Sequence, residues 1–291
     1  MPSQEFSSRK GSIWERTVFE GKSFPELREE MDGRVMAELK HYDDVSWEPG
    51  SAGPLSGKWA RPAAPNGKLM YYIHGGGFTL GSSGIAMPFL MELSHRLGIT
   101  CFSCDYRLAP EHTFPAAPED AFAGYRGLLE LGYAPEDIVI CGESAGATLS
   151  LDIPLMAREA GIPAPAAVVA LSPVTDATVK SDKKVLEGLD SGDRLYQIYA
   201  PGYSKDHPLI SPAFGDLTDY PAVFLCEGTA EALAGQCGIF AKKAAAAGCQ
   251  VQMLVGKDMI HTYPLDLWDY PEAMEAFETI ELFVRQQLRI S

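Results

Sequence analysis

Basic residues are scarce in this sequence. It has 24 lysines and arginines against 39 aspartates and glutamates in 291 residues, which gives a formal net charge of −15 at pH 7. The positive residues do not gather into a cluster, so a nucleic-acid backbone or an anionic membrane surface would repel the chain on average. We therefore expect no nucleic-acid partner.

Long apolar runs are also missing. A helix that crosses a bilayer needs roughly 18 or more consecutive apolar residues, and no window of the sequence approaches that length. The first residues, MPSQEF, are polar and do not resemble a secretion signal. These two absences predict a cytoplasmic protein without membrane insertion.

Cysteine occurs six times but without the spacing of a metal site. Cys101 and Cys104 form a C-x-x-C pair, but no second pair completes a zinc site, and the pair lies inside a strand-like apolar run. Several of the other cysteines also lie in apolar runs, which is typical of free buried thiols in a reducing compartment. We expect no disulfide, no metal and no redox role.

What the chain does have is a regular alternation of apolar runs with helical periodicities. One helical face carries Phe122, Tyr125 and Leu128, and another in the last helix carries Phe277 and Ile280. Such alternation predicts one α/β domain with parallel strands joined by helical crossovers. We predict eight strands, at residues 44–47, 55–61, 69–73, 99–104, 137–141, 166–171, 222–226 and 250–255.

Two segments do not follow this alternation. Near the N-terminus, Ser23 and Glu26 fit a capping box, and a helical stripe of Leu27, Met31, Val35 and Leu39 follows. Residues 178–219 are rich in Asp, Gly, Pro and Ser and show no clear periodicity. Both segments could cover the carboxyl edge of the sheet, although the leucine stripe could equally pack onto the core. The predicted division is an N-terminal cap segment at 1–40, an α/β core at 41–176 and 217–291, and an inserted cap or loop segment at 177–216.

The most informative motif is Gly142-Glu143-Ser144-Ala145-Gly146. It follows the apolar run 137–141 and opens a helical pattern, so Ser144 lies where a strand turns sharply into a helix. This is the context of a nucleophile elbow, in which small neighbours leave the serine hydroxyl exposed at the edge of a sheet. Pro154 falls inside the following helix, which we expect it to kink or shorten.

A second strand ends in a run of glycines. His74-Gly75-Gly76-Gly77 follows the apolar run 69–73, and its backbone N–H groups can point at a developing oxyanion. Phe78 follows at once, and with Phe24, Met31 and Met36 it could line a substrate pocket, although core packing would explain these four residues equally well.

A serine nucleophile needs a base and an acid, which follow it in the chain in this arrangement. His261 is the one histidine after the last core strand, so it is the expected base. The acid should follow the strand at 222–226 and accept the imidazole Nδ1–H. Glu231 is our choice, and the alternatives are Glu227, Asp176 and Asp258.

Other polar residues receive structural interpretations. We expect His74 to hydrogen-bond the glycine loop, His95 to face solvent from a helix at 88–97, and Glu143 not to be catalytic. The polar turn at 105–112 carries several charges, which we expect to pair among themselves because buried charges need partners.

Four motifs occur in a fixed order: HGGG at 74–77, YRLAPE at 106–111, GESAG at 142–146, and His261 before an aromatic residue. Together they resemble the hormone-sensitive-lipase branch of the α/β-hydrolases, over most of the chain from about residue 69 to 263. The resemblance implies an α/β-hydrolase fold, with a mostly parallel eight-stranded sheet and a small helical cap. It also implies a carboxylic-ester hydrolase that uses no metal or organic cofactor.

The same resemblance implies an oxyanion hole made by the N–H groups of Gly76, Gly77 and Ala145. The chain departs from the family at two positions. Glu231 stands where the family usually has Asp followed by Pro-Leu, and Gly235 stands where members often carry a further acidic residue.

The expected substrate is a small, soluble ester with a short acyl chain, because the expected cap is short and no long amphipathic lid is evident. An amidase or peptidase, or a deacetylase acting on a sugar or antibiotic ester, would use the same residues. A non-catalytic small-molecule receptor on this fold is the alternative from another class, and the presence of His261 argues against it. A homo-oligomer is possible.

Overall fold

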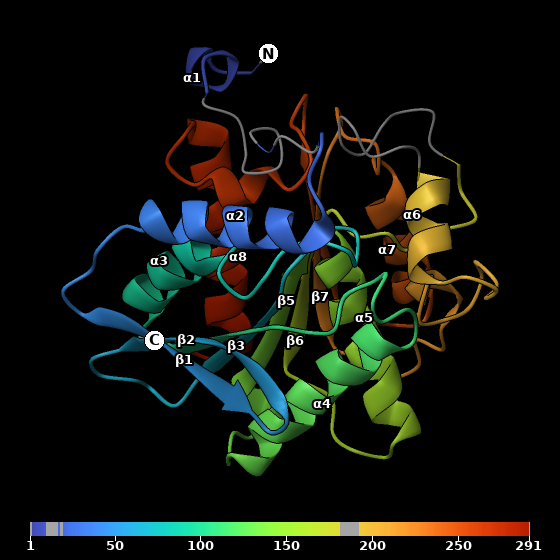
Figure 1. Ribbon diagram of the computed structural model, residues 1–291. Helices are drawn as coiled ribbons and strands as arrows, with labels where there is room; N and C mark the ends of the chain where they lie inside the picture. The colour runs from blue at the N-terminus through green and yellow to red at the C-terminus, as the bar shows by residue number, and fades with distance from the viewer. Residues whose placement is uncertain (1, 10–16, 18–19, 181–191, 291) are drawn as a thin grey trace.

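A mixed eight-stranded sheet forms the centre of the protein in the computed structural model, which describes residues 2–9, 17, 20–180 and 192–290 (Figure 1). The strand order is β1-β2-β4-β3-β5-β6-β7-β8. β2 runs antiparallel to β1 and β4, and the remaining neighbours are parallel. The strands are β1 (Val45–Ala52), β2 (Leu55–Pro62), β3 (Leu69–Ile73), β4 (Thr100–Cys104), β5 (Ile138–Glu143), β6 (Ala167–Leu171), β7 (Ala222–Gly228) and β8 (Val251–Gly256). All eight predicted strands are confirmed, although β1 extends five residues further than expected.

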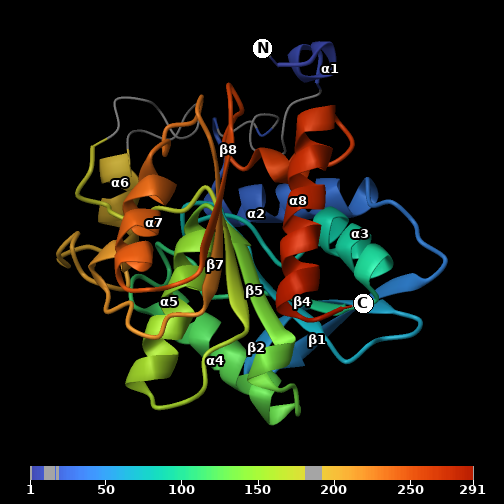
Figure 2. The same cartoon turned by 180° about the vertical axis from the view of Figure 1, so that it is seen from behind.

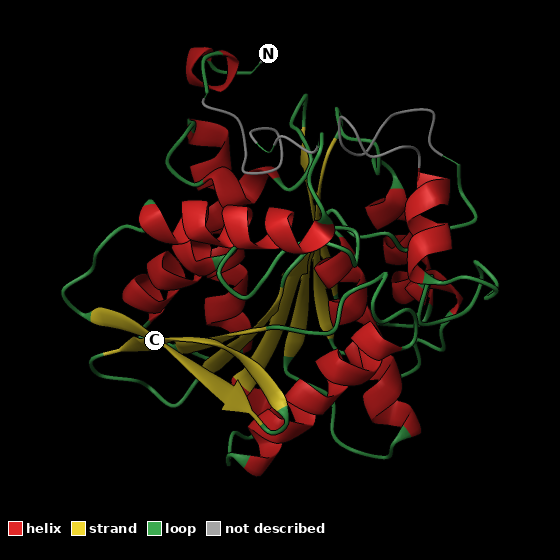
Figure 3. Cartoon of the chain, viewed as in Figure 1, coloured by secondary structure: helices red, strands yellow, loops and turns green. Residues whose placement is uncertain are grey.

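Helices cover both faces of the sheet, as Figure 3 shows by colour. The main ones are α2 (Phe24–Ala37), α3 (Met87–Leu97), α4 (Ala116–Glu130), α5 (Ala145–Glu159), α6 (Gly192–Tyr199), α7 (Gln236–Ala246) and α8 (Pro271–Gln287). Shorter helices are α1 (Gln4–Ser7), η1 (Pro135–Asp137), η2 (Pro212–Phe214) and η3 (Tyr263–Asp266). In the part of the chain described here, none of the helices combines the length and apolarity that a membrane span requires.

The central strands are buried on both faces, which explains their continuous apolar sequences. Along β3, Met70 and Tyr72 pack in the core cluster that contains α3 and α8. Leu69, Tyr71 and Ile73 point the other way, into the cluster that contains α4 and α5. Figure 2 shows α3 and α8 on one side of the sheet and α4, α5 and α7 on the other. The two-residue period of a strand thus builds two separate cores.

The helix after Ser144 is longer than expected. We expected Pro154 to kink or shorten the helix, but α5 continues past it to Glu159, so the proline does not shorten the helix. Leu149, Ile153 and Ala157 all pack in one core cluster, on both sides of the proline. Their burial favours the continuous helix, although a proline inside a helix removes one backbone hydrogen bond.

The N-terminal segment forms the helix that the capping box predicts. Ser23 and Glu26 make the reciprocal bonds of that box at the start of α2. Leu27, Met31 and Val35 are buried in a small cluster of their own with Leu80 and Ile85, two residues of the segment between β3 and α3. The helix therefore packs on the segment that follows the glycine run.

The inserted segment contains a helix that the sequence pattern did not indicate. α6 spans eight residues, Gly192–Tyr199. Its last residue, Tyr199, and the following Ala200 join the core cluster of α4 and α5. An eight-residue helix has about two turns, which is too short for an apolar period to stand out. Residues 181–191 of this segment lie outside the described residues.

Candidate active site

Ser144 occupies a sharp turn between β5 and α5. Its backbone has φ 53° and ψ −120°, a conformation that L-residues rarely adopt. The Ser144 amide donates to the Leu171 carbonyl at 2.8 Å. A side chain on Gly146 would overlap the Ile73 carbonyl, so the helix can lie this close to β3 only because that residue is glycine. The geometry of a nucleophile elbow is therefore present.

The glycine run lies directly beside this turn. β3 pairs with β5 in parallel, with Ile73 opposite Gly142, so the residues after each strand emerge together. A Cβ on Gly75 would stand 2.8 Å from the Glu143 carbonyl oxygen and 3.1 Å from Ser144 Cβ. Gly77, Ser144 and Ala145 line a common cavity. The fold thus brings the residues of both motifs to one place.

Glu231 and His261 form a hydrogen-bonded pair on the neighbouring strand ends. Glu231 Oε2 accepts a short hydrogen bond from His261 Nδ1, and Glu231 Oε1 accepts one from the Gly228 amide at 2.9 Å. The Glu231 side chain is fully buried, whereas that of His261 keeps 16% of its exposure. A buried carboxylate that accepts from Nδ1 leaves Nε2 as the free nitrogen of the imidazole.

The three alternative acids have other partners or other surroundings. Glu227 Oε2 accepts from the amides of Gly235 and Cys237, both at 3.0 Å, at the start of α7. Asp176 Oδ1 accepts from the Thr178 amide at 2.9 Å, and Asp258 is exposed. Among the residues that the structure describes, Glu231 is the carboxylate that contacts His261.

Ser172, which follows β6, links β7 to the loop that carries His261. Its Oγ accepts from the Thr262 amide at 3.1 Å, and its own amide donates to the Cys226 carbonyl at 2.7 Å. Ser172 is buried and has φ 52°. Our sequence analysis missed this residue. Its one signal was a Ser-Pro pair after a predicted strand.

A small apolar cavity opens at Ser144. Its volume is about 110 Å³. The ring of Phe78 stacks on that of Tyr199, with centroids 3.7 Å apart, along its wall. The lining consists of Gly77, Phe78, Ser144, Ala145, Val174, Ala177, Leu195, Tyr196, Tyr199, Ile210 and Leu233. Of the four residues that could have lined a pocket, Phe78 lines this cavity, whereas Met31 packs from α2 against Leu80 and Ile85.

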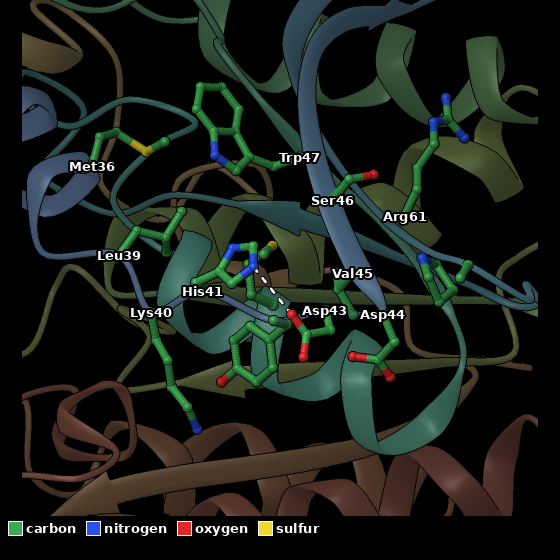
Figure 4. Close-up of a pocket in the computed structure, with 14 residues that line it drawn as sticks. Met36, Leu39, Lys40, His41, Asp43, Asp44, Val45, Ser46, Trp47 and Arg61 are labelled. Atoms are coloured by element: carbon green, nitrogen blue, oxygen red, sulfur yellow. Dashed lines mark ion pairs between the residues drawn. The ribbon is translucent and has the colours of Figure 1, made fainter.

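A larger groove lies elsewhere, beside the end of α2 and the start of β1 (Figure 4). It has a volume of about 550 Å³, and its lining includes Met36, Trp47 and the ion pair of His41 with Asp43. No residue of the Ser144 cavity lines this groove. Volume alone therefore does not identify the candidate active site.

Two buried titratable groups flank the elbow. Burial raises the pKa of Glu143 to about 7, against the opposing effects of the Tyr72 hydroxyl and the Gly75 amide. Burial also lowers the pKa of His74 to about 4, so its imidazole is neutral near pH 7. His74 Nδ1 donates to the Gly75 carbonyl oxygen at 2.8 Å, and the ring stacks on Tyr106. The expected hydrogen bond from His74 to the glycine loop is present.

The charged turn at 105–112 pairs differently from our expectation. Its charges do not pair among themselves but with other segments. Arg107 contacts Asp120 of α4 at 2.8 Å, and Glu111 contacts Arg28 of α2 at 2.9 Å. Asp105 accepts from the Ser83 amide at 2.6 Å. The reason is geometric: neighbouring residues of an extended turn point apart, so each charge finds a partner across the fold.

No group of three or more His, Cys, Asp and Glu side chains that could hold a metal ion occurs within residues 2–9, 17, 20–180 and 192–290. A serine on a strained turn, an imidazole held by a carboxylate and a glycine run define the class of the serine hydrolases with an α/β-hydrolase fold.

Comparison with known proteins identifies the family. Residues 70–265 match the family model described as alpha/beta hydrolase fold. The chain is 35% identical over 244 residues to an acetyl-hydrolase of Streptomyces hygroscopicus, with 81% of each protein covered. It is 30% identical over 240 residues to an esterase of Acinetobacter venetianus, covering 79% of this chain and 78% of that protein.

A solved structure supports the same family assignment. The crystal structure of an esterase from the bacterial hormone-sensitive lipase family superposes with a TM-score of 0.88 at 28% identity, covering 99% of both chains. The chain therefore belongs to the α/β-hydrolase family, in its hormone-sensitive-lipase branch, and is an enzyme of the carboxylic-ester hydrolase class.

Proposed function

We propose that this protein is a serine carboxylesterase that hydrolyses small, short-acyl esters through Ser144, His261 and Glu231. The observation that carries the proposal is the buried pairing of Glu231 with His261, on the same sheet edge as the Ser144 turn. In this arrangement the imidazole has the tautomer that a general base needs, with Nε2 free to take a proton.

The proposed reaction has two steps. His261 Nε2 takes the hydroxyl proton while Ser144 Oγ attacks the ester carbonyl, and Glu231 stabilises the imidazolium. The amides of Gly76, Gly77 and Ala145 donate to the oxyanion of the tetrahedral intermediate. Collapse expels the alcohol, which receives the proton from His261. A water molecule then attacks the acyl-enzyme by the same route and releases the acid.

The proposed preference for a short acyl group is supported by the cavity at Ser144. Its volume of about 110 Å³ is small beside the roughly 300–1,000 Å³ that ligand pockets usually have. Its lining is almost entirely apolar, which suits a short alkyl group. The Streptomyces relative is named an acetyl-hydrolase, which supports the same range of substrates.

A cytoplasmic location is part of the proposal. All six cysteines carry free thiols, and five of them are buried. Free thiols in these numbers are typical of proteins that fold in a reducing compartment.

The test is a series of p-nitrophenyl esters with acetate, butyrate, octanoate and laurate as acyl groups. We expect kcat/KM to be higher for acetate and butyrate than for laurate, and Ser144→Ala to lose activity. Ser204→Ala, which changes an exposed serine, is the matched control and should keep it. Faster hydrolysis of laurate would contradict the acyl preference. Activity retained by Ser144→Ala would contradict the mechanism.

A matched anilide separates this function from an amidase, because an amidase would hydrolyse the anilide at a comparable rate. Binding of a small ligand without hydrolysis of any ester would instead favour the receptor function.

A further inference from the structure

The loop that carries Gly76 and Gly77 has an unusual backbone. Three consecutive residues have positive φ: Gly76 at 107°, Gly77 at 61° and Phe78 at 61°. A positive φ is costly for a phenylalanine, so such a conformation persists only where the surroundings hold it. We call residues 75–80 the oxyanion loop. The contacts that hold this loop bear on function because they determine where the Gly76 and Gly77 amides point.

Part of the answer lies inside the loop. The Gly76 carbonyl accepts from the amides of Thr79 at 3.1 Å and Leu80 at 3.0 Å, and from Thr79 Oγ1 at 3.2 Å. On its other side, the Phe78 carbonyl accepts from the Ala109 amide at 2.8 Å. Another part of the protein that binds both Thr79 and Ala109 could therefore hold this turn in one conformation.

Arg28 of α2 contacts both positions. Its Nε donates to the Thr79 carbonyl at 2.8 Å, and one terminal nitrogen donates to the Ala109 carbonyl at 2.9 Å. The guanidinium also makes a two-pronged pair with the Glu111 carboxylate, at 2.9 and 3.1 Å. A planar guanidinium with fixed donor directions is suited to hold three acceptors in one geometry.

Partial burial of the Arg28 guanidinium strengthens its hydrogen bonds. The Arg28 side chain keeps 20% of its exposure, so its bonds are partly shielded from water. Next to it along α2, Leu27 and Met31 pack on Leu80, the last residue of the loop, and on Ile85 beyond it. Apolar packing sets the distance between α2 and the loop. The hydrogen bonds of Arg28 set the position of the loop along the helix.

We propose that Arg28 is a positioning residue for the oxyanion hole. It aligns the Gly76 and Gly77 amides by holding the Thr79 and Ala109 carbonyls on either side of Phe78. The inference rests on the proposed function, because it assumes that these amides meet an oxyanion. An oxyanion exists only in the transition state and the intermediate, so a misaligned loop should lower kcat and leave KM nearly unchanged.

The test compares Arg28→Ala and Arg28→Lys with wild type on the best short ester. For Arg28→Ala we expect kcat to fall about 10- to 100-fold, with KM within about two-fold of wild type, because small misplacements in an active site have effects of this size. The kcat of Arg28→Lys should lie between those of Arg28→Ala and wild type, since one ammonium group cannot reach three acceptors in a fixed plane.

A second readout reports on the hole itself. An alkyl trifluoromethyl ketone adds reversibly to the serine and leaves an oxyanion in the hole, so its Ki should rise with the fall in kcat. Val35→Ala is the control for helix stability, because Val35 is buried on the same face of α2 as Leu27 and Met31. It should lower Tm and leave kcat and Ki unchanged.

The inference is overturned if wild type is active, Ser144→Ala is inactive, and Arg28→Ala keeps kcat and Ki within about two-fold of wild type. It is equally overturned if Val35→Ala lowers kcat as much as Arg28→Ala at an equal loss of Tm. Failure of the proposed function has a different signature: wild type would hydrolyse no ester and form no adduct with the ketone.

Discussion

Glu231 and His261 meet across the ends of two neighbouring strands, and each carboxylate oxygen of Glu231 has a separate partner. One oxygen accepts from His261 Nδ1, and the other accepts from the Gly228 amide. The second bond fixes the carboxylate, so that its direction toward the imidazole does not depend on a flexible side chain.

Replacing this carboxylate tests the proposed triad. Glu231→Gln should lower kcat about 10³- to 10⁴-fold, because a neutral amide neither fixes the productive tautomer nor stabilises the imidazolium. Glu231→Asp should retain more activity than Glu231→Gln. Asp176→Asn is the control and should stay near wild type in the same ester assay. If Asp176→Asn abolishes activity with the fold intact and Glu231→Gln does not, the assignment of the acid is wrong.

Glu143 should make stability depend on pH. Its pKa is raised by burial from 4.5 to about 7 in the folded protein. Between these values the unfolded chain releases the proton and the folded one keeps it, so the free energy of unfolding falls as pH rises, by at most roughly 3 kcal/mol. Below this window the group contributes its full stability, and above it the loss is complete.

The measurement for Glu143 is urea unfolding at about pH 5 and about pH 8, with Glu143→Gln as the variant. The neutral amide should reduce the fall in stability between the two conditions. Glu159→Gln, which changes an exposed glutamate, should leave the fall as in wild type. An equal fall in wild type and Glu143→Gln would show that Glu143 does not carry this titration.

Ser172→Ala should affect both stability and turnover. The substitution leaves the Thr262 amide without its acceptor, which costs about 1–3 kcal/mol when the group is buried. It also loosens the loop that carries His261, so kcat should fall. Ser94→Ala is the matched control, because it removes a buried hydroxyl that donates to the Ile99 carbonyl in another part of the fold. A similar fall in kcat for both variants would argue against a link between Ser172 and His261.

Leu195→Ala should shift the acyl preference toward longer chains. Leu195 lines the cavity at Ser144, and a Cβ on Gly77 would stand only 3.2 Å from its Cδ1. Removing it should raise the octanoate-to-acetate ratio of kcat/KM by about 10-fold or more, since single methylenes in such pockets already change rates by this factor. Leu282→Ala, on the exposed surface of α8, should leave the ratio unchanged. An unchanged ratio in Leu195→Ala would mean that the acyl group binds elsewhere.

Much of this architecture was predictable because it depends on local sequence. The eight strands follow from runs of apolar residues, and the elbow follows from small residues around Ser144 after such a run. His261 was found by its position after the last core strand. In each of these cases the pattern of neighbours along the chain is also the cause of the structure, so it can be read without the fold.

Other features depend on residues far apart in the chain. Four carboxylates could have served as the acid, and only the folded loops show that Glu227 is engaged by the start of α7 while Glu231 faces His261. The partners of the charged turn, the short helix α6 and the contacts of Arg28 were likewise not evident. The sequence by itself determined the fold and indicated the proposed nucleophile and base, because apolar periodicity and close glycine packing act over a few residues. Only the tertiary structure decided which carboxylate and which cap residues reach the site, because hydrogen-bond partners are chosen by distances in space.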